Sequence, residues 1–216
     1  DAFLARNNLG TIFNGRKQYA LAADQFRAAL ALKPEFLEAH SNLGLALTEL
    51  GRYDEAEQHL LEAVRIKPEF SKVQYCLGKL YARMNRLEEA KVHYALAIQS
   101  EPAMAEAHYD LGTLWQQQGE RTRAIACYRN ALVVRPVYAE AHNNLANLLA
   151  EDGKLPEAIE HYRLALSAAP DLGQTHYNLG VKLAELKRNA EAIEHLRAAN
   201  RLLPTVADTY IQLAKA

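Results

Sequence analysis

Histidine is the residue of this chain whose type and spacing first suggest chemistry, because imidazole can bind a metal or transfer a proton near neutral pH. The eight histidines occupy only two kinds of position, and within each kind they recur at one constant interval or at twice that interval. The first kind comprises His40, His108, His142 and His176, and the second comprises His59, His93, His161 and His195.

This spacing argues against a metal centre. Zinc needs several ligands that converge on one point, for example two histidines on one helical face with three residues between them. Here the closest pairs, such as His93 and His108, are separated by far more than a helical turn and fall on different predicted helices. The chain also lacks a glycine-rich phosphate loop, a nucleophile elbow and paired catalytic carboxylates. We therefore expect no catalytic residue, metal or cofactor, and we interpret the histidines as packing or surface residues.

The histidines belong to a pattern that returns at a fixed interval along the whole chain. Leu-Gly dipeptides end at Gly10, Gly44, Gly78, Gly112 and Gly180, and Ala146 fills the remaining place. Prolines stand at Pro34, Pro68, Pro102, Pro136, Pro170 and Pro204. An alanine that precedes a large apolar or aromatic residue by four positions occurs at Ala22, Ala56, Ala90, Ala124, Ala158 and Ala192. So many positions in register over six periods indicate tandem structural units.

Each unit is predicted to form two helices. In residues 37–70 an apolar stripe with a helical period marks the first helix. The stripe comprises Ala39, Leu43, Leu47 and Leu50. Gly51 predicts the turn, because glycine adopts the left-handed conformation without steric cost. Asp54 is the predicted N-cap of the second helix, and Pro68 ends that helix. The turn position of three other units holds Lys17, Asn85 and Lys187.

This pattern resembles the tetratricopeptide repeat family. The resemblance implies an all-α, right-handed α-solenoid of tandem 34-residue helix-turn-helix repeats, which forms a single domain over residues 1–216. The expected repeats are 3–36, 37–70, 71–104, 105–138, 139–172 and 173–206, with a partial repeat at 207–216. The partial repeat has no second helix to cover it, so we expect either a continuation in the natural protein or end-to-end self-association.

The glycine of each Leu-Gly dipeptide falls within a helix, where it costs about 1 kcal/mol relative to alanine. We expect the paired helix to approach so closely that no side chain fits. The facing residue would be the small alanine of the second helix, such as Ala56 opposite Gly44. Ala146 indicates that one repeat accommodates a methyl group.

Composition limits the class of function. The net charge is −1, so the chain lacks the overall basic balance of a generic nucleic-acid binder. It contains no apolar run long enough to span a membrane, and no export leader opens it. We expect a cytoplasmic protein, or an exported one whose leader is absent from this chain. Cys76 and Cys127 are predicted to be free thiols.

In the tetratricopeptide repeat family the first helices line a concave groove, to which the resemblance assigns positions 2, 5, 6, 9, 12 and 13 of each repeat. Position 6 holds Asn8, Asn42, Cys76, Asp110, Asn144 and Asn178. Asparagine is a poor helix former, and its amide both donates and accepts hydrogen bonds. The row is therefore predicted to pair with the backbone of a protein or peptide ligand. The alternative is that each asparagine bonds to the neighbouring repeat or to water.

Other groove positions are aromatic or charged. The aromatic anchors expected to contribute binding energy are Tyr75, Tyr109 and Tyr177. A predicted basic patch, suited to a ligand carboxylate, comprises Lys72, Lys79 and Arg83. The acidic residues of the wall are Glu38, Glu49, Glu106, Glu140, Glu151 and Glu185. The alternative interpretation is that these charges only face solvent. Position 5 lacks the lysine of the family's carboxylate clamp, so chaperone C-termini are not expected as ligands.

The strings AHSNL (39–43), AHNNL (141–145) and AIEHYRLAL (158–166) resemble the repeats of O-GlcNAc transferase. In that enzyme an asparagine ladder holds protein substrates. The residues that match the ladder are Asn8, Asn42, Asn144 and Asn178, and Cys76 and Asp110 interrupt it.

Three functions follow from these patterns. The first is a non-catalytic scaffold that binds an extended or helical segment of a partner protein in the groove. The second is the substrate-recruiting arm of a larger, O-GlcNAc-transferase-like glycosyltransferase. The third is a structural protein that assembles end to end.

Overall fold

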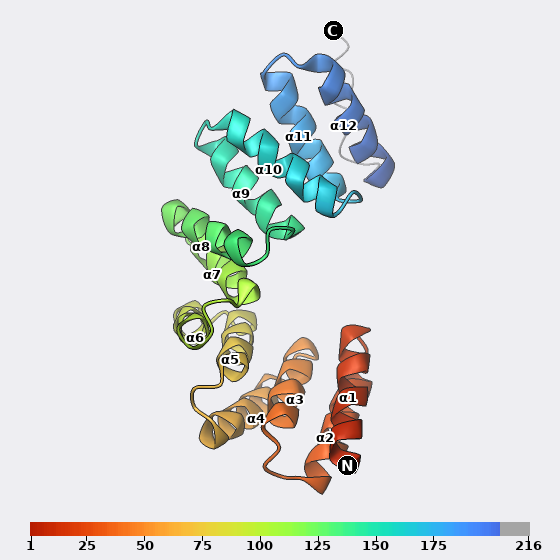
Figure 1. Cartoon of the computed structure of the whole chain (residues 1–216), viewed down its shortest axis with the longest axis vertical. Coiled ribbons are helices and arrows are strands. Elements are labelled where there is room, and N and C mark those ends of the chain that lie inside the picture. Colours follow the sequence, from red (N-terminus) through yellow and green to blue (C-terminus); the bar gives the residue numbers. More distant parts are fainter. Residues whose placement is uncertain (204–216) are drawn as a thin grey trace. The chain divides into compact units, whose positions relative to one another are not determined.

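The computed structural model describes residues 1–203, so Pro204 and the partial repeat 207–216 lie outside the described residues. The described part of the chain consists of helices and confirms the predicted all-α class (Figure 1). Its helices are α1 (Ala2–Gly15), α2 (Tyr19–Leu32), α3 (Leu37–Glu49), α4 (Tyr53–Ile66), α5 (Ser71–Arg83), α6 (Leu87–Ser100), α7 (Ala105–Gln117), α8 (Arg121–Val134), α9 (Ala139–Glu151), α10 (Leu155–Ala168), α11 (Gly173–Glu185) and α12 (Asn189–Leu202).

The helices follow the predicted repeats. Helices α3, α5, α7, α9 and α11 begin at the first residue of repeats two to six. The chain divides into two compact units between Ala107 and His108. In the first unit, α1, α3 and α5 pair with α2, α4 and α6, and consecutive pairs pack on one another. In the second unit, α9 and α11 pair with α10 and α12 in the same way. The single domain and the right-handed superhelix remain predictions.

The turn between the two helices of a repeat needs a residue in the left-handed conformation. Gly51 has φ +74°, and the amide of the next residue, Arg52, donates to the Leu47 carbonyl at 2.9 Å. This bond satisfies a carbonyl that the end of α3 would otherwise leave without a partner. Lys17, Asn85 and Lys187 adopt φ 59° at the same place. The predicted turn position is therefore confirmed even where it holds no glycine.

Lysine is strained at this turn, which leads to a first testable prediction. A left-handed conformation costs a residue with a Cβ about 1–2 kcal/mol, whereas glycine adds about 0.5–1 kcal/mol of unfolded-state entropy. We expect Lys17→Gly to raise the free energy of unfolding by about 0.5–1 kcal/mol, measured by urea denaturation. Gly51→Ala is the reciprocal variant and should lower it. An unchanged stability in both variants would contradict the argument.

Two predicted details of the second repeat are wrong. Asp54 is not an N-cap, because α4 begins at Tyr53, and Arg52 occupies the cap position without a side-chain hydrogen bond. Leu50 does not belong to the buried stripe, because it is the C-cap residue of α3 and is 38% exposed. The end of α3 and the start of α4 thus both lie one or two residues earlier in the chain than the sequence pattern suggested.

The mid-helix glycines are explained by a different neighbour from the one expected. A Cβ built on Gly44 would lie 2.5 Å from Leu60 Cγ, and one on Gly10 would lie 2.5 Å from Phe26 Cε1. The residue over the glycine is thus the large side chain of the second helix, and the predicted facing alanine, Ala56, is not among the nearest atoms. The glycine leaves space for this side chain, which is buried in the core of the repeat.

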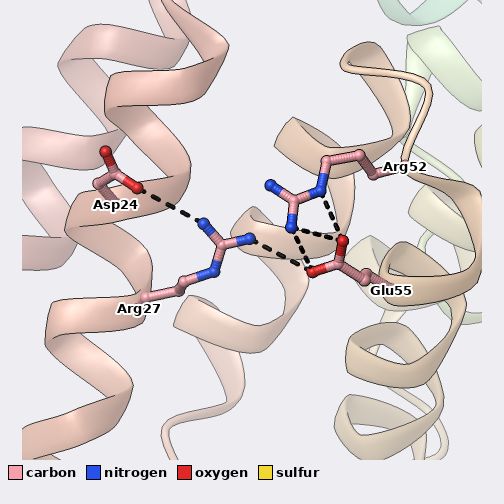
Figure 2. A network of polar contacts seen from close by, with 4 residues as sticks. All are labelled: Asp24, Arg27, Arg52 and Glu55. Atoms are coloured by element: carbon pink, nitrogen blue, oxygen red, sulfur yellow. Dashed lines mark hydrogen bonds and ion pairs between the residues drawn. The ribbon is translucent and has the colours of Figure 1, made fainter.

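Ion pairs join the second helices of neighbouring repeats on the surface. Arg27 of α2 contacts Glu55 of α4 at 3.4 Å, and Asp24 and Arg52 complete this network (Figure 2). The same offset recurs from Arg129 to Glu157 and from Arg163 to Glu191, at 2.8 and 2.6 Å. Exposed pairs of this kind contribute about 0–1 kcal/mol each, so they support the stacking that the apolar core establishes.

Candidate functional site

In the first unit the asparagine row is used between repeats. Asn42 is 7% exposed, and its Nδ2 donates to Asn7 Oδ1 of the preceding repeat at 2.9 Å. Its Oδ1 accepts from Lys72 Nζ of the following repeat at 2.7 Å. Asn8 is exposed and Cys76 is buried. The amide of Asn42 therefore links three successive repeats, and its contact with a ligand stays a prediction.

The second unit uses the row similarly. Asn144 Nδ2 donates to Tyr109 OH at 3.2 Å, and Asn178 Nδ2 donates to Asn147 Oδ1 at 3.0 Å. Both acceptors belong to the preceding repeat, and Asp110 of the same row is half-buried. These contacts agree with the alternative interpretation, in which asparagine bonds to its neighbouring repeat.

The predicted aromatic anchors pack partly against their own repeats. The Tyr75 ring centroid lies 5.8 Å from that of Tyr94, and the Tyr109 centroid lies 5.7 Å from that of Tyr128. Both side chains are half-buried, as is Tyr177. Each ring therefore keeps an accessible part that a ligand can contact.

The predicted basic patch already holds a carboxylate of this chain. Lys79 Nζ lies 3.1 Å from Glu49 Oε1, and Arg83 Nη2 lies 2.9 Å from Glu49 Oε2. The Glu49 side chain is only 14% exposed. The third member, Lys72, is bonded to Asn42. A ligand carboxylate would have to compete with Glu49 for Lys79 and Arg83, whose charge Glu49 partly offsets, whereas Lys72 is held by the neutral amide of Asn42.

A pocket of about 400 Å³ lies within the second unit, between α7, α9, α10 and α11. Of the predicted residues it contains Tyr177, Asn178 and the wall residue Glu151. Gln116, Asn147 and Tyr162 also line it. They occupy groove positions 12 and 9 of the first helices and the large-residue position of a second helix.

Two tyrosine hydroxyls orient two amides at this pocket. Tyr128 OH donates to Gln116 Oε1 at 2.6 Å, and Tyr162 OH donates to Asn147 Oδ1 at 2.6 Å. Burial raises the pKa of Tyr128 to about 12, and it also raises the pKa of Tyr162. Both hydroxyls therefore keep their protons at neutral pH and act as donors.

The side-chain amide nitrogens of Gln116 and Asn147 are available to donate hydrogen bonds to a ligand. With their oxygens held by the tyrosines, Gln116 Nε2 and Asn147 Nδ2 have no hydrogen-bond partner among residues 1–203. The sequence analysis missed both residues. The signal that could have found them is a tyrosine in the buried large-residue column, since a buried hydroxyl needs an acceptor nearby.

The structure pairs the histidines, which the sequence analysis treated as distant. His40 and His59, 19 residues apart, approach to 3.1 Å between their Nδ1 atoms. His142 with His161, and His176 with His195, do so at 2.9 Å. Residues with this separation lie on the two helices of one repeat and face each other. The sequence analysis did not predict the pairs because it compared only distances along the chain.

The predicted free thiols are confirmed, because Cys76 and Cys127 form no disulfide. Burial raises the pKa of each thiol to about 11, so both are neutral and unreactive near pH 7. Across residues 1–203 no group of three or more histidine, cysteine or acidic side chains is placed to hold a metal ion. No helix in that range has the length and apolarity needed to cross a membrane.

Models of the tetratricopeptide repeat match residues 1–69, 116–172 and 71–104. No curated protein is significantly similar to the chain in sequence. PilF of Pseudomonas aeruginosa has a similar structure, with a TM-score of 0.86 at 20% identity over 100% of this chain and 98% of PilF. PilW, a type IV pilus biogenesis factor, gives 0.78 at 20% identity over 100% of this chain and 99% of PilW. YrrB, described as having an unusual peptide-binding site, gives 0.68 at 22% identity over 89% and 98%. At these identities the likeness concerns the fold.

Proposed function

Because the chain belongs to the tetratricopeptide repeat family, we propose that it is a non-catalytic scaffold that binds an extended segment of a partner protein. The binding site is the pocket between α7, α9, α10 and α11. The observation that carries this proposal is the pair of oriented amide donors, Gln116 Nε2 and Asn147 Nδ2, on neighbouring repeats.

These donors favour an extended ligand over a helical one. The interior carbonyls of a helix already accept hydrogen bonds from their own chain, whereas the carbonyls of an extended segment are available. Tyr162 and Tyr177 provide apolar surface beside the donors. Because the tyrosines hold the amides in place before binding, less conformational entropy is lost on association.

Charge contributes little to this recognition. Glu151 pairs with Arg121 at 2.9 Å, and Lys182 pairs with Glu185 at 2.7 Å. The acidic wall is thus partly neutralised by the chain itself. We expect binding to depend weakly on salt, in contrast with a carboxylate or nucleic-acid ligand, whose affinity falls steeply as salt rises.

The test uses peptides selected by display on the protein. The double variant Gln116→Glu, Asn147→Asp keeps the oxygens that Tyr128, Tyr162 and Asn178 bind and replaces only the donor groups. We expect Kd, measured by isothermal titration calorimetry, to rise at least about fivefold, since two lost hydrogen bonds of about 0.5–1.5 kcal/mol each correspond to about 1–3 kcal/mol.

The matched control is Gln99→Glu, an exposed residue of α6 that adds charge outside this pocket. It should leave Kd unchanged. If the double variant binds the selected peptides as tightly as the control, the pocket is not the site. If the selected peptides are helical when bound, the extended mode is wrong.

The other two functions remain predictions. A role as the recruiting arm of an O-GlcNAc-transferase-like enzyme rests on the sequence strings alone. End-to-end assembly through the partial repeat involves residues outside those described. A cytoplasmic location, or an exported one, is likewise a prediction.

A further inference from the structure

The three histidine pairs make the same set of contacts. In each, the first-helix histidine also bonds through Nε2 to the carbonyl of the proline near the end of the preceding repeat. These bonds join His40 to Pro34, His142 to Pro136 and His176 to Pro170, at 2.8, 2.9 and 3.1 Å. A chain of three groups therefore runs from the proline carbonyl through the first imidazole to the second.

The third repeat shows where the protons lie. There Gln74 replaces the first histidine, with Nε2 donating to Pro68 O at 2.9 Å and Oε1 accepting from His93 Nδ1 at 2.7 Å. Because a carbonyl only accepts, the first-helix histidines must carry hydrogen on Nε2. When neutral, they then offer a lone pair on Nδ1. The second-helix histidine must donate its Nδ1 hydrogen, as His93 does.

This arrangement determines how many protons a pair can hold. His161 can accept a proton on Nε2 and still donate from Nδ1 to His142. A second proton has only His142 Nδ1 as its site, where it would face the Nδ1–H of His161 across 2.9 Å. The hydrogen bond would be lost, and two positive charges would meet. We propose that each histidine pair is an acid-sensitive latch between the two helices of its repeat. The hydrogen bond of the pair is kept when the neutral pair gains one proton, and it is lost when the pair gains a second.

The charged groups around the pairs do not remove this penalty. Beside His161 they are Arg129 from α8 and Glu157 and Glu160 from α10. Beside the His40–His59 pair they are Arg27 and Glu55, which Figure 2 shows paired with each other, and Glu62, which is paired with Arg65. Beside His195 they are Arg163, Glu191 and Glu194. Of these glutamates, Glu55, Glu157 and Glu191 are bonded to arginines of the preceding repeat.

The direction of the pH effect follows from these surroundings. Burial, then the paired histidine, lowers the pKa of His59, His161 and His195, and burial also lowers that of His93. The unfolded chain therefore binds more protons than the folded one below the ordinary histidine pKa of about 6.5. The stabilisation is complete above that pH and is lost as the pH falls through the folded-state values.

Two reciprocal variants test the latch. His142→Gln copies the natural Gln74–His93 arrangement, so it keeps both hydrogen bonds, loses the ring contact with His161 and removes one titratable group. Opening of the α9–α10 pair is measured by native-state hydrogen exchange, each variant being compared with the wild type at the same pH. We expect equal protection in the two proteins at pH 7.5. Below pH 6.5 the opening constant should increase less steeply in the variant than in the wild type, with a difference of up to about tenfold for each pH unit.

Gln74→His creates a histidine pair in the third repeat. In this variant the opening constant of the α5–α6 pair should increase more steeply below pH 6.5 than in the wild type. Nitrogen chemical shifts provide a direct check of the protons, because His59, His161 and His195 should be Nδ1–H tautomers and their partners Nε2–H tautomers. The latch is refuted if either variant keeps the wild-type pH dependence, or if the paired imidazoles titrate independently near their ordinary pKa.

Discussion

Replacing Tyr128 with alanine should lower the free energy of unfolding by about 3–5 kcal/mol, the cost typical of removing a fully buried aromatic side chain. Tyr128 is 0% exposed and belongs to a core cluster with Leu145 and Leu149. Its ring also packs against Tyr109, with 5.7 Å between the centroids. The cavity would open between repeats four and five. The substitution would therefore remove packing contacts within the fourth repeat and contacts between the fourth and fifth repeats. Urea denaturation measures the change.

The companion variant Tyr128→Phe separates packing from hydrogen bonding. It keeps the ring and removes the bond to Gln116, so it should cost only about 0.5–1.5 kcal/mol. It should also weaken peptide binding, because the Gln116 amide is then free to turn. A Tyr128→Ala variant no less stable than Tyr128→Phe would show that the ring does not hold the two repeats together.

Replacing Gly78 with alanine should lower the free energy of unfolding by about 1–3 kcal/mol, as expected for an overpacked core. The new methyl would lie 2.5 Å from Tyr94 Cδ1 and 2.6 Å from Cε1. Tyr94 is 2% exposed, so the ring cannot move into solvent. The loss exceeds the gain of about 1 kcal/mol in helix propensity.

The control for this variant is Gly15→Ala. Gly15 lies at the end of α1, and a Cβ there meets no atom within 4 Å. The same substitution should therefore leave stability unchanged or raise it by up to about 1 kcal/mol. A loss of similar size at both glycines would mean that backbone effects, and not the contact with Tyr94, decide the outcome. Ala146, which coexists with Tyr162 in repeat five, shows that a methyl is accepted where the neighbouring ring is placed for it.

The repeat itself was predictable from the sequence because its determinants are local. Gly51 and Pro156 act on the backbone within one turn of where they stand, through the freedom of φ at glycine and the missing proline amide hydrogen. The turn residues adopt the expected φ, and Pro156 lies in the first turn of α10. Because the repeat contains each of these local signals several times, the sequence predicted the helix pairs, and the predicted helix boundaries lie within one or two residues of the observed ones.

Only the tertiary structure decided which side chains meet. The AHxNL and AIEHY strings pointed to a ligand-binding ladder, yet their histidines bond across the helix pair and Asn42 bonds between repeats. Glu49 was assigned to an open acidic wall, yet it neutralises Lys79 and Arg83. Gln116 and Asn147 stand at groove positions of the repeat, but only the structure shows that tyrosines of the second helices hold their amide oxygens. The physical reason is that periodicity specifies the helical face on which a residue lies, whereas the angle and closeness of packed helices select its partner from among several residues on the facing helix.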